Sequence, residues 1–277
     1  MAAARRRRLD LELVRRGHAE SRQQAQQLID AGLVLVGGAA ADKPARLVAP
    51  GDPLQVLGPP ARFVGRGGEK LAAALQRFDL DVAGARALDA GSSTGGFTDA
   101  LLQAGADSVV AVDVGRAQLH ERLRADRRVD VREQTDIRQV RAADVGGPLD
   151  VVVADLSFIS LHAVIDVLLG LLAEHGDLVV LVKPQFEAGR AEVSRGRGVI
   201  RDPDVWRRVL QEVATAIGAA GGAIMGAMVS PLRGADGNAE FLVHVRPARS
   251  DAGPDVHTAG CELDLDALVD EATGSAP

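Results

Sequence analysis

Residues 89–97 read Asp89-Ala90-Gly91-Ser92-Ser93-Thr94-Gly95-Gly96-Phe97, a glycine-rich turn that directly follows an apolar run. A strand that enters such a turn and then a helix predicts a nucleotide-like ligand, because the backbone can approach the ligand closely there. The glycine spacing differs from the dinucleotide pattern G-x-G-x-x-G. It also differs from the P-loop, since no Gly-Lys-Ser/Thr follows. The turn therefore favours a ligand without a pyrophosphate.

Outward from this turn, apolar strand candidates alternate with helical segments. Nearly continuous apolar strands separated by helices indicate a parallel sheet covered on both faces, which predicts an α/β fold of the Rossmann-like type. Ligands of such sheets bind at the carboxyl ends of the strands. The expected strands are Arg86 to Asp89, Val109 to Asp113, Asp150 to Asp155, Asp177 to Val182 and Phe241 to Val245, with helices near 95–104, 161–173 and 203–219.

Acidic residues follow two further strands. Asp113 ends the second strand, where a carboxylate can accept hydrogen bonds from a ribose diol, and Asp136 lies at the expected end of the third, where an adenine edge could be read. Each acid alone could be a helix cap, but their convergence at strand ends predicts an adenosine without phosphates, S-adenosylmethionine. The predicted cofactor-binding residues are Asp89, Gly91, Ser92, Ser93, Thr94, Gly95, Gly96, Phe97, Asp113, Asp136 and Asp155.

Four polar residues interrupt apolar surroundings and form the candidate catalytic set. Lys70 begins a helical run after Gly67-Gly68, Asp155 and Lys183 each end an apolar strand, and Glu240 opens the last strand. A lysine at the end of five apolar residues is poorly solvated unless a carboxylate is near. A purely structural ion pair between Asp155 and Lys183 is the alternative interpretation.

Paired lysines suit the methylation of a hydroxyl group. A ribose hydroxyl must lose its proton as it attacks a sulfonium methyl, and lysine is a poor base at its ordinary pKa near 10.4. Burial and a second nearby ammonium group disfavour the charged form of a lysine, so that one amine can act as base while the other positions or stabilises the alkoxide.

Other methylation chemistries fit the sequence less well. Methyltransferases that act on amino groups of bases usually carry two prolines where this chain has Leu156-Ser157-Phe158. Methylation at C5 of a pyrimidine requires a thiol, and the single cysteine, Cys261, lies in the expected tail. Aromatic residues make up only 3% of the chain, which leaves few platforms for a flipped base. Those near the motifs are interpreted as core residues: Phe63, Phe97, Phe158 and Phe186.

Charge and turn residues divide the chain. Residues 1–58 form a small basic unit with two short helices and two β-like runs, Leu33 to Val36 and Leu54 to Leu57. A linker over 59–66 leads to the methyltransferase domain at 67–247. Residues 248–277 contain one arginine and seven acids and are expected to be a disordered acidic tail. No apolar run approaches membrane length and the start lacks a signal-peptide core, which predicts a cytoplasmic protein.

Basic side chains predict contact with RNA phosphates. A second basic loop, Arg190 to Arg201, contains Gly196 and Gly198 and is expected to act as a mobile lid at the catalytic edge. A solvated basic surface is the alternative for any one arginine. The predicted RNA-binding residues are Arg5, Arg6, Arg7, Arg8, Arg15, Arg16, Arg22, Lys43, Arg62, Arg66, Arg190, Arg195 and Arg197; no metal site and no obligate protein partner are expected.

Taken together, the motifs resemble the TlyA (haemolysin A) family of rRNA 2′-O-methyltransferases. The resemblance covers roughly residues 5–246, and the N-terminal unit looks like the small αL RNA-binding domain. The matching segments are Asp89 to Asp99, Val112 to Gly115, Ala154 to Ser160, Val182 to Glu187 and Gly237 to Phe241.

The resemblance implies a class I methyltransferase domain whose tetrad is Lys70, Asp155, Lys183 and Glu240. It also implies that the substrate is a cytidine ribose in 16S and/or 23S rRNA, within 30S and/or 50S subunits. Two segments depart from the family pattern, Gly65 to Lys70 before the first lysine and Arg116-Ala117 after the ribose-binding acid. A ribosome-assembly factor without turnover and a membrane-active haemolysin remain as disfavoured alternatives.

Overall fold

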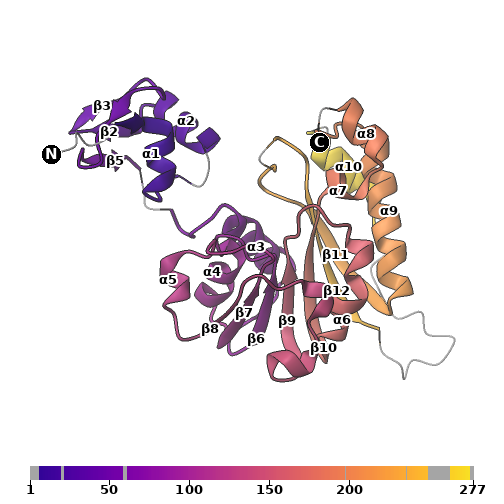
Figure 1. The fold of residues 1–277 in the computed structure, drawn as a ribbon. Helices are drawn as coiled ribbons and strands as arrows, with labels where there is room; N and C mark the ends of the chain where they lie inside the picture. The colour runs from indigo at the N-terminus through magenta and orange to yellow at the C-terminus, as the bar shows by residue number, and fades with distance from the viewer. Residues whose placement is uncertain are drawn as a thin grey trace. The chain divides into compact units, whose positions relative to one another are not determined.

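A computed structural model describes residues 6–19, 22–58, 61–196, 198–234, 236–248 and 263–274, without the side chains of 190, 191 and 195. The chain forms two compact units, Met1–Ala61 and Arg62–Pro277, which are described separately (Figure 1). Among the described residues, no helix combines the length and the apolarity needed to span a membrane.

The N-terminal unit packs two helices against short strands. Leucines spaced along the first helix and an alanine and an isoleucine on the second form its core, with Leu9, Leu13, Ala25 and Ile29 almost completely buried. The central strand pairs antiparallel with two others, in the order β3-β2-β5. In chain order the elements are β1 (Arg7–Arg8), α1 (Leu9–Arg15), α2 (Arg22–Asp30), β2 (Val34–Val36), β3 (Ala39–Ala40), β4 (Leu47–Val48) and β5 (Leu54–Val56).

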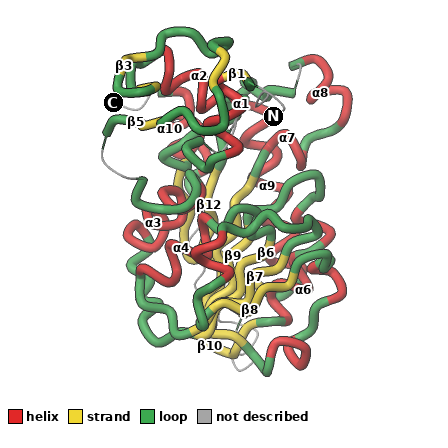
Figure 2. Tube along the Cα trace, turned by 60° about the vertical axis from the view of Figure 1, so that its left-hand side comes forward, coloured by secondary structure: helices red, strands yellow, loops and turns green. Residues whose placement is uncertain are grey.

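The larger unit is built on a seven-stranded sheet in the order β11-β12-β10-β9-β6-β7-β8 (Figure 1). Figure 2 shows strands of this sheet in yellow and the helices around them in red. The strands are β6 (Arg86–Ala90), β7 (Ser108–Val112), β8 (Val129–Arg132), β9 (Leu149–Ala154), β10 (Leu172–Val182), β11 (Gly222–Val229) and β12 (Phe241–Pro247). The helices are α3 (Gly67–Arg77), α4 (Gly96–Gln103), α5 (Glu121–Arg124), α6 (Ile165–Gly170), α7 (Pro184–Glu187), α8 (Arg190–Arg195), α9 (Pro203–Ala219) and α10 (Leu265–Thr273). Short 3-10 helices cover Ile137–Gln139, Ala142–Val145 and Leu161–Ala163.

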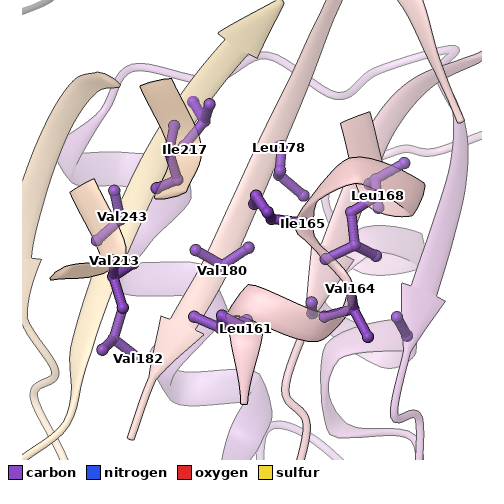
Figure 3. Packing of buried hydrophobic residues seen from close by; sticks show 14 of the residues in the cluster. Leu161, Val164, Ile165, Leu168, Leu178, Val180, Val182, Val213, Ile217 and Val243 are labelled. Atoms are coloured by element: carbon purple, nitrogen blue, oxygen red, sulfur yellow. The ribbon is translucent and has the colours of Figure 1, made fainter. Parts of the chain in front are cut away.

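Both faces of this sheet are buried, as the apolar strands predict. Within β10, Leu178 and Val180 face the core beneath α6 and α9, whereas Val179 and Leu181 face the core beneath α3 and α4. Figure 3 shows the first of these cores, in which Leu168 and Val213 pack against the strands. This alternation places apolar side chains on both faces of the central strands.

The structure corrects three expectations. The sheet is mixed, because β12 runs antiparallel to both of its neighbours. Part of the expected disordered tail is a helix: α10 buries Leu268, Val269 and Ala272, since its apolar residues recur at helical spacing despite its acidic composition. The expected loop Arg190 to Arg201 begins with a helix, α8.

Candidate active site

The glycine-rich turn lies where the strand order of the sheet reverses. β6 has β7 on one side and β9 on the other, and in an open parallel sheet such a switch point forms a crevice at the carboxyl ends of the strands. Gly91 N donates to Val112 O at 2.8 Å, and Asp155 N donates to Ala90 O at 3.0 Å. The ends of β6, β7 and β9 are therefore tied together at this point.

Gly91 is required by both its backbone angle and its neighbours. Its φ of +85° lies in the left-handed region, and a Cβ here would stand 2.6 Å from Asp155 O. Gly95 combines a φ of +98° with a Cβ position 2.8 Å from a methyl of Leu119. Neither position therefore has room for a side chain, because the protein itself fills the space beside the backbone.

A pocket of about 610 Å³ opens at this edge of the sheet. Its size is in the range of small-molecule sites. Its lining includes five of the predicted cofactor-binding residues, Gly91, Ser93, Asp113, Asp136 and Asp155. It also includes residues that the sequence analysis did not assign to the cofactor: Val112, Val114, Gly115, Gln118, Thr135, Ile137, Arg138, Leu156, Ser157, Phe158 and Ile159.

Asp113 is oriented by backbone donors on either side of the pocket. Its Oδ2 accepts from Ser93 N at 2.8 Å, and its Oδ1 accepts from Gly115 N at 2.6 Å. Each carboxylate oxygen keeps a further lone pair, so the group can still accept hydrogen bonds from a ligand diol.

Asp136 lines the same pocket, but its carboxylate is engaged by the chain. It accepts from Arg138 N at 3.0 Å and pairs with the Arg138 guanidinium, whose hydrogen bond holds the pKa of Asp136 below its ordinary value. Arg138 is itself a lining residue. This side of the pocket therefore presents an acid and a guanidinium side by side.

The other predicted cofactor residues lie in β6, in the turn and in α4 but do not line the pocket: Asp89, Ser92, Thr94, Gly95, Gly96 and Phe97. Asp89 is completely buried, and its Oδ2 accepts from both the backbone N and the Oγ1 of Thr98. Desolvation raises the pKa of Asp89 to about 7, although the Thr98 hydrogen bonds act in the opposite direction. Its Oδ1 has no hydrogen-bond partner. Asp89 thus accepts hydrogen bonds from the first turn of α4 and helps to hold that turn in place.

Two lysine–carboxylate pairs stand beside the pocket. Lys183 Nζ lies 2.5 Å from Asp155 Oδ1 and donates to Ser157 Oγ at 3.0 Å. Lys70, on α3, donates through Nζ to Glu240 Oε2 at 2.5 Å. Both lysines are largely buried, as is Glu240, whereas Asp155 is partly exposed and lines the pocket.

Strand register explains why the two pairs meet at one edge. The pairing of β10 with β12 ends at Val182 and Phe241, so the next residues, Lys183 and Glu240, lie next to each other. On the other side, β9 ends at Ala154 opposite Val180. The start of α3 approaches the same place, since a Cβ on Gly67 would lie 3.8 Å from Asp155 Oδ2. The predicted tetrad is therefore assembled in one location.

Phe158 is not the core residue that the sequence analysis expected. It is 92% exposed, has a φ of +64°, and lines the pocket. Its ring lies 5.1 Å from the Phe186 ring, and the Lys183 Nζ is 5.8 Å from the Phe186 centroid. Its position directly beyond the end of β9 was the available signal, since side chains there belong to the ligand edge rather than to the core.

The predicted RNA-binding arginines fall into different groups. Arg16 directs its guanidinium into the N-terminal unit, where it contacts Glu12 and the carbonyls of Ala49, Pro50 and Asp52. These bonds use most of its donors and leave few for the phosphate contact that was predicted for it. Arg8, Arg15 and Arg22 pair with acids of their own unit. Arg62 lies over the Phe63 ring. Arg5 and Arg197 and the side chains of Arg190 and Arg195 lie outside the described residues.

Comparison with known proteins identifies the class of protein that this fold and site define. The FtsJ-like methyltransferase family model matches residues 63–246, and the S4 domain model matches residues 7–54. The larger unit is therefore an FtsJ-like methyltransferase domain, and the smaller unit is an S4 domain.

Relatives that match over most of this chain identify the family within this class. The 16S/23S rRNA (cytidine-2′-O)-methyltransferase TlyA of Mycobacterium tuberculosis is 49% identical over 244 residues, which span 88% of this chain and 91% of the relative. Hemolysin A of Brachyspira hyodysenteriae is 38% identical across 86% of this chain and 98% of its own length. A solved structure from Streptococcus thermophilus, described as a candidate hemolysin, superposes with a TM-score of 0.78 at 37% identity, covering 99% of this chain and 98% of that one. The chain belongs to the TlyA family, which confirms the resemblance seen in its motifs.

Proposed function

We propose that the protein transfers a methyl group from S-adenosylmethionine to the ribose 2′-hydroxyl of a cytidine in 16S and/or 23S rRNA. The observation that carries this proposal is the pair of buried lysine–carboxylate contacts, Lys183 with Asp155 and Lys70 with Glu240, beside a pocket suited to an adenosine. The activity named for the Mycobacterium tuberculosis relative supports the choice of cytidine and of rRNA.

The pocket fits S-adenosylmethionine on two grounds. The Asp113 carboxylate is oriented to accept a ribose diol, and the rest of the lining is mainly uncharged. A pyrophosphate would need several aimed cationic or backbone donors, whereas the lining carries three acids and one arginine. When bound, the cofactor supplies an electrophilic methyl group on a sulfonium.

Lys183 is the amine best placed to take the hydroxyl proton. Its two partners, Asp155 and Ser157, both line the pocket, whereas Lys70 is paired with the buried Glu240 behind them. In its uncharged form the Lys183 amine would accept the 2′-hydroxyl proton as that oxygen takes the methyl group, which the cofactor would supply with a neutral thioether as the leaving group. The Lys70 ammonium, which Glu240 holds in place at the same edge of the sheet, would favour the developing alkoxide.

Phe158 gives the target nucleoside a surface to stack on. A phenylalanine exposed to 92% with a left-handed backbone is costly to the folded state, and such features concentrate at binding sites. Base–aromatic stacking tolerates any base, so this contact would hold the nucleotide beside Lys183 without selecting it.

Transfer of radiolabelled methyl to purified 30S and 50S subunits tests the proposal. We expect label in rRNA, with nuclease-resistant 2′-O-methyl sites at cytidine when the positions are mapped. Label only on a base carbon or nitrogen would overturn the reaction. Absence of label on either subunit, with S-adenosylmethionine bound, would favour an RNA-binding role without turnover.

A further inference from the structure

Two buried acids of the S4 domain are surrounded by arginines. Asp10 and Glu12, both on α1, are 0% and 1% exposed. Neither belongs to the hydrophobic core of the unit, and a buried carboxylate is costly unless donors surround it. Here the donors are arginines from the set predicted to bind RNA.

Asp10 holds two of these arginines and a glutamine. Arg8 makes a bidentate contact with Asp10, in which Nε donates to Oδ1 at 3.0 Å and Nη2 donates to Oδ2 at 2.8 Å. Arg22 Nε donates to Oδ2 at 2.9 Å, and Gln26 Nε2 donates to the same oxygen at 3.1 Å. The backbone N of Leu11 completes the set at 2.9 Å. Asp10 therefore links β1 to α2 through their arginines.

Glu12 holds Arg15 in the same manner. Arg15 donates Nε to Oε2 at 2.8 Å and Nη2 to Oε1 at 2.6 Å. A guanidinium that engages a carboxylate with its Nε–Nη2 edge turns its other edge away from that carboxylate. Arg8 and Arg15 share this arrangement, and their side chains remain 38% and 49% exposed.

Arg16 shows the contrasting arrangement. It also contacts Glu12, but its Nη groups donate to backbone carbonyls of residues 49, 50 and 52, and its side chain is only 19% exposed. Pairing with a buried acid therefore does not by itself turn an arginine inward. Arg16 differs from Arg8 and Arg15 because the second edge of its guanidinium contacts the chain, whereas theirs faces solvent.

We propose that Asp10 and Glu12 are positioning residues for RNA binding, which hold Arg8, Arg22 and Arg15 so that their second guanidinium edges meet RNA phosphates. We call these five residues the arginine cradle. This inference rests on the proposed RNA-binding function of the S4 domain. Three oriented arginines lose less side-chain freedom on binding than three mobile ones, and a planar fork matches phosphate geometry.

For the removal of an acid, the arginine cradle and net charge alone predict opposite effects on RNA affinity. Removing an acid from an RNA-binding surface strengthens the attraction to phosphate if charge alone matters. If Asp10 positions Arg8 and Arg22, then Asp10→Asn weakens binding although the protein becomes more positive. Asp30→Asn is the matched control, because Asp30 is an exposed acid of the same unit outside the cradle.

The test uses the full-length chain and in vitro transcribed 23S rRNA, with Kd measured by filter binding at several KCl concentrations. Asp10→Asn should raise Kd several-fold and reduce the slope of log K against log [KCl] by about one to two, the loss of one or two phosphate contacts. Asp30→Asn should leave Kd unchanged or lower it. An Asp10→Asn protein that binds as tightly as the wild type would overturn the cradle.

Folding and the underlying function are checked separately. If thermal unfolding shows that Asp10→Asn is not folded, Arg8→Lys replaces it in the binding test. Lysine keeps the positive charge at this partly exposed position but cannot form the bidentate contact of an arginine. Arg8→Lys should then weaken binding, and wild-type affinity in that variant would overturn the cradle. A wild-type chain that fails to bind the RNA would instead overturn RNA binding itself.

Discussion

The side chain of Lys183 lies between two polar partners, Asp155 at 2.5 Å and Ser157 at 3.0 Å, directly after the apolar residues 178–182 that end β10. Two roles are compatible with this geometry. The amine can take a proton from the substrate, or its positive charge can hold Asp155 in place. Arginine separates the two roles, because it keeps the charge and cannot be deprotonated in proteins.

Lys183→Ala and Lys183→Arg should both lower the rate of methyl transfer by about 10²-fold or more, the usual contribution of a general base. Transfer of labelled methyl to purified subunits measures the rate, and calorimetry with S-adenosylmethionine serves as the control, since cofactor affinity should persist. Activity restored by the arginine variant would assign Lys183 to positioning alone. Activity that survives in the alanine variant would remove it from the mechanism.

Asp89 makes the stability of the protein depend on pH in an unusual direction. Its pKa is raised from 3.8 to about 7 by desolvation, against the opposing Thr98 hydrogen bonds and with the added repulsion of Asp155. Between these two values the folded protein holds a proton that the unfolded chain has released. The contribution of Asp89 to the free energy of unfolding is therefore largest below pH 3.8, falls as the pH rises through this window, and is lost above about pH 7.

Asp89→Asn removes this titration and keeps an acceptor for Thr98. The free energy of unfolding of the variant, relative to the wild type, should increase from pH 5 to pH 8 by on the order of 1–3 kcal/mol. Urea unfolding at the two pH values measures this difference in the free energy of unfolding. The titration of all other acids is the same in both proteins and cancels in the comparison. An equal difference at both pH values would show that Asp89 is ionised throughout.

At the scale of elements, the turn between β6 and α4 determines whether the crevice exists. Gly84 offers a matched control for Gly91, because its φ is +74° but a Cβ there would meet nothing within 4 Å. Gly84→Ala should cost about 1–2 kcal/mol, the strain of a left-handed residue. Gly91→Ala adds a clash with Asp155 O and should cost about 2–4 kcal/mol.

Urea unfolding compares the two glycine variants, and titration with S-adenosylmethionine shows which of them affects the pocket. We expect cofactor binding to weaken in Gly91→Ala only, since relief of the clash moves the end of β6 away from that of β9. Equal losses of stability in the two variants would mean that backbone strain, and not the close approach to Asp155, explains the glycine.

Element prediction succeeded where the periodicity was strong. The helix at 203–219 was expected at its observed bounds, because Val209, Val213 and Ile217 recur at helical spacing. β11 was not assigned, since its glycines, alanines and methionines carry little strand signal, and its partner β12 supplies the pairing. The antiparallel direction of β12 depends on how the chain returns to the sheet, which no local pattern encodes.

On the scale of the whole molecule, the S4 domain and the pocket proposed for the cofactor belong to two compact units. Lys43, in the N-terminal unit, is exposed and was predicted to contact phosphate. Lys43→Ala should weaken binding to 23S rRNA and reduce its salt slope by about one. The Kd for S-adenosylmethionine, measured by calorimetry, should not change, and a clear change there would show that the two units are energetically coupled.

The sequence by itself determined the glycine-rich turn, the polar residues at the strand ends and the division into two units, because strand periodicity and the switch-point rule act locally. It could not determine which groups meet. Lys70 and Glu240 are 170 positions apart and are joined only by the register of β10 with β12 and the docking of α3. The same holds for Asp89, which the sequence analysis placed among the cofactor-binding residues and which packing placed beneath the turn, and for Asp10 and Glu12, whose burial decides how the arginines face. Burial and pairing are properties of the packed molecule, since they depend on neighbours that the chain brings together only when it folds.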